Sequence, residues 1–165
     1  MIFPKRIQPT QGQESVWDYP RPPRVERVSK RIVIEIAGVT LADTTGAYRV
    51  LETSHPPVYY LPQSDIRMEY LQRTPRTSFC EFKGSATYWA VAVGDRIEPN
   101  AAWGYLDPAP GFEPIAGYIA FYAGRMDRCT VDGETVEAQP GDFYGGWITS
   151  DVVGPFKGGA GTWGW

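Results

Sequence analysis

Apolar and polar residues alternate along many short segments of the chain, which is the pattern of half-buried β-strands. Residues 31–36 (RIVIEI) carry isoleucine at every second position. The Ala37-Gly38 pair that follows predicts a tight turn into a returning strand, and Asp132-Gly133 predicts a second hairpin. Further strands are predicted within residues 39–43, 48–53, 58–61, 77–82, 85–93, 101–106, 115–122 and 128–138.

One segment has the pattern of a short helix near residues 64–72. Ile66, Tyr70 and Leu71 would share one face of that helix, and Asp65 suits its first turn. With at least eight strands around it, this pattern predicts a mainly β, antiparallel fold of small twisted sheets. Strands and helices do not alternate along the chain, which excludes a doubly wound nucleotide-binding fold.

The composition divides the chain into three parts. Residues 1–25 contain five prolines and no sustained periodicity, which predicts an arm with Trp17 and Tyr19 as docking points. Residues 26–139 carry the strand patterns and predict a single domain, as expected for a chain of 165 residues. Residues 140–165 are rich in glycine and aromatic residues, and they predict a covering segment that packs through its aromatic side chains.

Charge and composition argue against several classes of function. Nucleic-acid binding needs a concentrated basic face, whereas the net charge is −3. No apolar run approaches the roughly 20 residues of a membrane span, and no hydrophobic leader precedes the arm, so we expect a cytoplasmic protein. Cys80, Cys129 and His55 are too few for a four-ligand zinc site, so we expect no metal and no cofactor. The oligomeric state stays open, and a homodimer is one of the options.

Two segments suggest chemistry that their context does not support. His55 could serve as a general base, but no nucleophile is linked to it by position, and the Ser-His-Pro-Pro context predicts a surface histidine in a turn. The glycine-rich GPFKGGAGT segment invites comparison with a phosphate-binding loop. Lys157 precedes its glycines, however, and no helix can follow, which excludes that type of loop.

The segment CEFKGSATYW carries more suggestive chemistry. Lys83 precedes Gly84 at the start of a strand, where its amine could hold an anionic group. A solvent-exposed lysine at a strand end is an equally good interpretation. Cys80 could be an activated thiol beside Lys83, although a buried and inert cysteine is the simpler interpretation.

Carboxylates and aromatic residues could complete such a site. Glu52 and Asp65 could act as acid-base partners, but their spacing does not fix how far apart they lie. Trp103 and Tyr105 are two residues apart on a predicted strand and therefore face the same way. Together with Tyr88 they could line a cavity for a small ligand. Aromatic packing in the core is the alternative.

Three sequence blocks occur in order within residues 30–132: VLETSHPPVYYLPQSDI, TSFCEFKGSATYWAV, and AAWGYLDPAPGF followed by IAGYIAFY. They resemble the bacterial domain of unknown function 427, a family catalogued as nucleotidyltransferase-like, and the arm and tail look like those of longer, cyanobacterial-type members. The resemblance implies a β-tent fold, similar to the thalidomide-binding domain of cereblon and to methionine sulfoxide reductase B. The motif residues that match include Glu52, Tyr60, Asp65, Lys83, Tyr88, Trp103, Tyr105 and Tyr122.

Three hypotheses of function follow. The leading one is a small-molecule-binding domain whose pocket is formed by these eight motif residues, with Lys83 and a carboxylate, Asp65 or Glu52, orienting the ligand. The second is a metal-independent enzyme that uses Lys83 or Cys80 with Asp65 or Glu52 as its acid-base partner. The third is a protein-interaction module that docks through its aromatic tail. A nucleotidyltransferase would need paired carboxylates to hold Mg²⁺, and the sequence shows no such pair.

Overall fold

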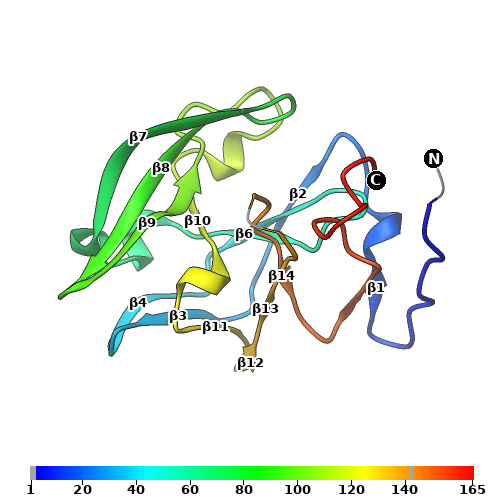
Figure 1. The fold of residues 1–165 in the computed structure, drawn as a ribbon, viewed down its shortest axis with the longest axis horizontal. Helices are drawn as coiled ribbons and strands as arrows, with labels where there is room; N and C mark the ends of the chain where they lie inside the picture. The colour runs from blue at the N-terminus through cyan, green and yellow to red at the C-terminus, as the bar shows by residue number, and fades with distance from the viewer. Residues whose placement is uncertain (1–2, 142) are drawn as a thin grey trace.

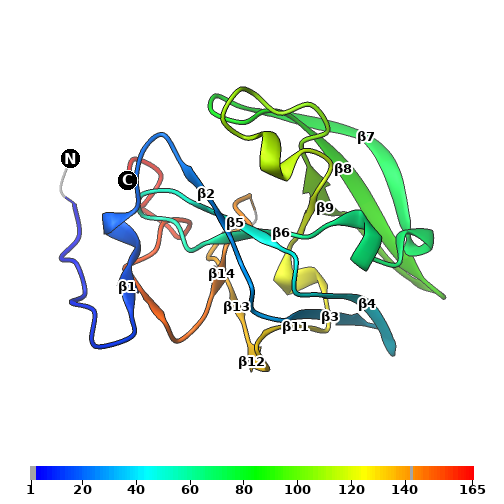
Figure 2. The same ribbon diagram turned by 180° about the vertical axis from the view of Figure 1, so that it is seen from behind.

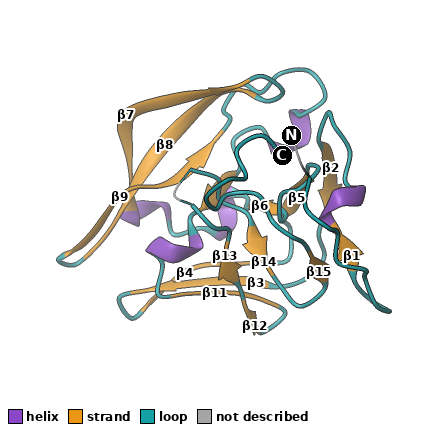
Figure 3. Cartoon of the chain, turned by 45° about the vertical axis from the view of Figure 1, so that its right-hand side comes forward, coloured by secondary structure: helices purple, strands orange, loops and turns teal. Residues whose placement is uncertain are grey.

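The structure is a computed structural model that describes residues 3–141 and 143–165. The first two residues of the predicted arm, and Asp142 of the predicted covering segment, lie outside the described residues. Figure 3 shows short strands joined by loops and single 3-10 turns. The strands are β1 (Glu14–Ser15), β2 (Arg24–Arg27), β3 (Ile32–Ile36), β4 (Val39–Thr44), β5 (Tyr48–Leu51), β6 (Val58–Tyr60), β7 (Leu71–Cys80), β8 (Gly84–Val93), β9 (Arg96–Gly104), β10 (Ile119–Phe121), β11 (Arg128–Val131), β12 (Glu134–Thr135), β13 (Glu137–Ala138), β14 (Trp147–Ile148) and β15 (Val152–Val153). The 3-10 turns are η1 (Val16–Asp18), η2 (Gln63–Asp65), η3 (Met68–Tyr70), η4 (Glu113–Ile115) and η5 (Ala123–Arg125).

Two four-stranded sheets enclose the main apolar core. One has the order β10-β9-β8-β7 and the other the order β12-β11-β3-β4, and Figure 1 shows the long β7-β8-β9 sheet splayed away from β3, β4 and β11. Core residues from both sheets pack together, including Ile34 and Ile36 of β3 with Val91 and Val93 of β8. A third sheet has the order β2-β5-β6 and lies toward the viewer in Figure 2. The prediction of a mainly β, antiparallel fold is confirmed.

Two hairpins form where the sequence predicts them. Ala37 and Gly38 have φ values of 50° and 77°, and Asp132 and Gly133 have φ values of 47° and 81°. Two consecutive residues at positive φ make a turn whose twist matches the flanking strands. The isoleucines of β3, which leads into the first of these turns, are all buried on one face of the sheet, as their spacing predicts.

The helix predicted near residues 64–72 is reduced to the two single turns η2 and η3. Between them Ile66 is extended and bridges Ala42 of β4, and the Arg67 amide donates to the Leu41 carbonyl across 2.8 Å. These long-range contacts bury Ile66 and take the backbone groups that a helix would use. Leu71, predicted to be helical, already begins β7. Tertiary pairing therefore overrides the local helical pattern.

The arm and the tail form a small core of their own. β1 of the arm pairs in parallel with β15 of the tail, and Figure 1 shows the described part of the arm and the tail on the same side of the molecule. The Trp17 ring lies 5.6 Å from the Trp165 ring, and its indole nitrogen donates to the Pro155 carbonyl across 2.9 Å. Trp17 and Tyr19, the predicted docking points, are both buried. The arm thus holds the tail against the domain.

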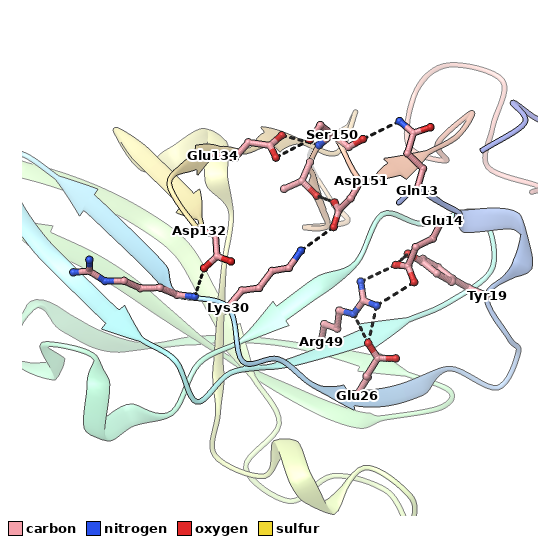
Figure 4. Close-up of polar contacts among 12 residues, drawn as sticks. Gln13, Glu14, Tyr19, Glu26, Lys30, Arg49, Asp132, Glu134, Ser150 and Asp151 are labelled. Atoms are coloured by element: carbon pink, nitrogen blue, oxygen red, sulfur yellow. Dashed lines mark hydrogen bonds and ion pairs between the residues drawn. The ribbon is translucent and has the colours of Figure 1, made fainter. Parts of the chain in front are cut away.

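Ion pairs reinforce this contact between arm, domain and tail (Figure 4). Arg49 of β5 donates to Glu14 of the arm across 2.9 Å and pairs with Glu26 of β2 across 2.6 Å. Lys30 reaches Asp151 of the tail at 3.0 Å. Burial lowers the pKa of the Arg49 guanidinium, but the two carboxylates outweigh it and the pKa is raised, so Arg49 stays charged. Within residues 3–141 and 143–165, no helix has the length and apolar character to cross a bilayer.

Candidate functional site

A cavity of about 450 Å³ opens between the β5-β6 pair, the inner ends of β8 and β9, the β7–β8 turn and the tail. Its volume is typical of sites for small organic ligands. Ten aromatic residues line its wall: Tyr60, Phe79, Phe82, Tyr88, Trp103, Tyr105, Tyr122, Phe143, Tyr144 and Trp165.

Strand alternation directs these aromatic rings inward. Tyr59 and Tyr60 are neighbours on β6 and therefore point to opposite faces. Tyr59 stacks on Trp147 in the main core, whereas Tyr60 lies in the cavity wall, 6.3 Å from Tyr105. Trp103 and Tyr105 face the same side, as their spacing predicts, and both line the cavity.

The tail packs directly on Trp103. The rings of Trp103 and Tyr122 are 4.5 Å apart, and a Cβ atom added to Gly145 would collide with the indole. The Tyr122 hydroxyl donates to the Phe143 carbonyl across 2.8 Å, and the Tyr88 and Ser78 hydroxyls share a hydrogen bond of 2.9 Å. The tail segment around Gly145 is therefore a fitted part of the wall.

Polar side chains from the arm and from the domain line the other side of the cavity. Arg21 pairs with the Glu52 carboxylate across 3.2 Å and also reaches the main-chain oxygen of Trp165 at 3.3 Å. Glu52 lies 3.6 Å from the Nε2 atom of His55. The charge of Glu52 is thus matched by Arg21 within the wall itself.

His55 is buried, so the prediction of a surface histidine is wrong. The side chain of Gln139 accepts from the Gly146 amide, which makes its nitrogen the donor to the Nδ1 atom of His55 at 3.1 Å. Nδ1 is therefore unprotonated, and the imidazole proton lies on Nε2, toward Glu52. Burial, together with the nearby cations Lys157, Arg21 and Lys83, lowers the pKa of His55 to about 3. His55 is neutral at physiological pH.

Two lysines approach the cavity from different segments. The Lys83 amine lies 5.7 Å from the centroid of the Tyr105 ring, and the Lys157 amine lies 5.3 Å from that of Tyr144. Lys157 is only 9% exposed. In the part of the chain that the structure describes, neither amine has a side-chain carboxylate as ion-pair partner, unlike Arg21.

Tyr60 and Tyr105 of the wall are neutral phenols. Burial raises the pKa of Tyr60 and of Tyr105 well above the usual value for tyrosine, and the charges of neighbouring groups add to the effect. Neutral phenols present a hydrogen-bond donor and a ring face. The wall can therefore stack a flat group and donate to its polar atoms.

All but one of the predicted ligand-binding residues lie in this wall. The exception is Asp65, whose carboxylate accepts a hydrogen bond of 2.7 Å from the Thr44 hydroxyl outside the cavity. Cys80 is half-buried and lines the cavity, so it is not the fully buried cysteine of the simpler interpretation.

Sequence analysis missed the wall residues from outside the three blocks. Arg21, Tyr144 and Lys157 all line the cavity, and Lys157 was considered only within a rejected phosphate-loop pattern. The one available signal was its position in a glycine-rich segment, which allows close approach of the backbone. Across the described ranges, no group of three or more His, Cys, Asp or Glu residues is placed to hold a metal ion.

Comparison with known proteins gives a family and no function. A family model described as a domain of unknown function (DUF427) matches residues 24–132, which is about two thirds of the chain. A search of curated proteins found no match.

Proposed function

We propose that this chain, which belongs to the family of domain of unknown function 427, is a small-molecule-binding domain. The observation that carries the proposal is the convergence of aromatic rings from separate segments of the chain on one cavity of about 450 Å³. Such rings stack on flat ligands, while the few polar groups fix their orientation. Tyr60, Trp103 and Tyr105 would form the stacking surface, with Lys83 and Glu52 at its polar edge.

Ligand-observed NMR with small neutral aromatic compounds, 2-naphthamide among them, tests this proposal. The variant Val58→Trp replaces a small wall residue of β6 with a bulky ring that fills the cavity, and it should abolish saturation transfer to the probe. Ile97→Trp is the matched control, because Ile97 is 64% exposed and lies outside the cavity wall. Equal transfer in the wild type and in Val58→Trp would contradict binding in the cavity.

A metal-independent enzyme is the second candidate, because Cys80, Lys83 and Glu52 line the same cavity. Asp65 has no place in it, since its side chain is bonded to Thr44 elsewhere. An activated thiol reacts as a thiolate below its ordinary pKa of about 8.5. Alkylation of Cys80 by iodoacetamide as a function of pH tests this candidate, and Cys129, which is buried, serves as the internal control. If the alkylation rate of Cys80 has its midpoint near pH 8.5, the thiol is not activated, and this result would contradict Cys80 as the nucleophile.

A docking role for the tail is the third candidate. Trp163 is 87% exposed, which is unusual for so large an apolar side chain. If this ring mediates self-association, sedimentation equilibrium should show a dimer for the wild type and a monomer for Trp163→Ala. A monomeric wild type at high concentration would speak against the homodimer.

A further inference from the structure

Lys157 is a buried cation that has no side-chain carboxylate as partner among the residues that the structure describes. The residue is 9% exposed, and its amine contacts the main-chain oxygen of Trp165, the last residue of the sequence, at 3.4 Å, which is long for a charged hydrogen bond. A buried charge with so weak a contact is unfavourable. An anion entering the cavity would replace this weak contact with a strong one.

The backbone of Lys157 is held firmly in place. Its amide donates to the Ser54 carbonyl across 2.9 Å, and its own carbonyl accepts from the Gln139 side chain at 2.8 Å. The aliphatic stem of the side chain therefore starts from a fixed point, and the amine rests near the Tyr144 ring. A preorganised cation loses little entropy when a ligand binds.

Lys83 supplies a second amine from the β7–β8 turn. Its carbonyl accepts from the Ala109 amide across 2.9 Å, which fixes the turn, and its amine lies over the Tyr105 ring. Lys83, Lys157 and Arg21 all act on the buried ring of His55, so the three positive charges share one region of the molecule.

The carboxylates of the wall do not cancel these charges. Glu52 is occupied by Arg21, and Glu81 is exposed in the β7–β8 turn. Among the described residues, the amines of Lys83 and Lys157 have no side-chain carboxylate as partner and remain for a ligand, in a chain whose overall charge is −3. The local excess of positive charge is thus a property of this cavity.

From this arrangement we infer, building on the proposed function, that the cavity selects a flat aromatic ligand that carries an anionic group. The rings of Trp103 and Tyr105 would hold the flat part, and Lys157 and Lys83 would hold the anion. Carboxylates and phosphate monoesters both offer the oxygen atoms that an ammonium group binds.

Two matched pairs of probes test this inference by isothermal titration calorimetry on the full chain. 2-Naphthoate is compared with neutral 2-naphthamide, and adenosine 5′-monophosphate with adenosine. We expect at least one anion to bind about tenfold or more tightly than its neutral partner, as a charge-assisted hydrogen bond provides. Whichever pair shows the difference identifies the anion as a carboxylate or a phosphate.

Lysine variants locate the effect. Lys157→Met and Lys83→Met should each weaken binding of the anion about tenfold more than they weaken binding of its neutral partner. Lys5→Met, which removes the same charge from an exposed position in the arm, should change neither. Thermal melting of each variant establishes that it is folded.

The outcomes separate this inference from the proposed function. If neutral and anionic partners bind equally well, and Lys157→Met has no effect, the anion specificity is wrong while the aromatic site stands. If no probe of either pair binds the wild type, both the inference and the proposed function are overturned.

Discussion

The side-chain amide nitrogen of Gln139 donates to the Nδ1 atom of His55 across 3.1 Å, although 84 positions separate the two residues in the sequence. The same nitrogen donates to the Lys157 carbonyl, and the amide oxygen accepts from Gly146. One buried glutamine thereby joins the histidine of the domain to the tail, and it fixes both at the edge of the cavity.

Replacing Gln139 with leucine should be strongly destabilising. Gln139→Leu keeps the volume of the side chain but leaves three buried polar groups without partners. We expect the free energy of unfolding to fall by about 3 kcal/mol, because each buried unpaired group costs about 1–3 kcal/mol. Urea denaturation measures the change. Gln72→Leu on the exposed edge of β7 is the control and should stay within about 0.5 kcal/mol of the wild type.

The stability of the protein should fall as the pH drops below about 6.5. The folded state keeps His55 neutral with a pKa of about 3, whereas an unfolded chain protonates histidine near pH 6.5. The unfolded state therefore binds more protons between these values, and the free energy of unfolding falls with decreasing pH by up to about 1.4 kcal/mol per pH unit. This stabilisation is complete above pH 6.5.

The variant His55→Asn isolates this effect. Asparagine offers an oxygen in place of Nδ1 but does not titrate, so its denaturation curves should lack the slope between pH 6.5 and pH 5. Equal slopes for the variant and the wild type would show that His55 is not the group responsible.

A methyl group at position 145 should disturb the cavity. Gly145 lies so close to the Trp103 indole that Gly145→Ala forces the ring or the tail to move. Overpacking of this kind typically costs about 1–3 kcal/mol, and tryptophan fluorescence should report the shift of the ring. Gly124→Ala is the matched control, because its added Cβ meets only the Ala138 methyl at an ordinary 4.0 Å. Unchanged stability in both variants would contradict the close packing.

Two tryptophans near the chain ends should differ sharply in their importance. Trp17 is 8% exposed and Trp163 is 87% exposed. Trp17→Ala should lower the free energy of unfolding by about 3–5 kcal/mol or release the arm and tail, and limited proteolysis would detect that release as cleavage within the tail. Trp163→Ala should leave stability and proteolysis unchanged. A tail that stays protected in Trp17→Ala would contradict the role of the arm as its anchor.

Features set by neighbouring residues could be predicted from the sequence. The turn at Asp132-Gly133 needs two positive φ values, which aspartate and glycine tolerate. Tyr59 and Tyr60 must face opposite sides of a strand, and only the second reaches the cavity. Most of the predicted wall residues sit on such strands, so alternation and the family motifs suffice to bring them together.

Features that depend on residues far away in the sequence could not be predicted from it. Asp65 is the last residue of η2, and its carboxylate bonds to the Thr44 hydroxyl because the neighbouring Ile66 pairs with β4. His55 is buried because Gln139 and Tyr144 of a later segment close over it. Lys157 belongs to the cavity because the tail turns back along the arm. None of these contacts leaves a local pattern, so no periodicity or motif could reveal them.

The family model begins at Arg24 and ends at Asp132. It therefore excludes Arg21 and Lys157 but includes Trp103 and the other aromatic residues of the strands. In the proposed site, the domain that the family model covers would provide the stacking surface for a ring, while the flanking segments would provide two of the charges around it. If the proposal holds, relatives with different flanking segments should still bind flat molecules but prefer ligands of a different charge. Ligand specificity could then diverge without any substitution in the domain that defines the family.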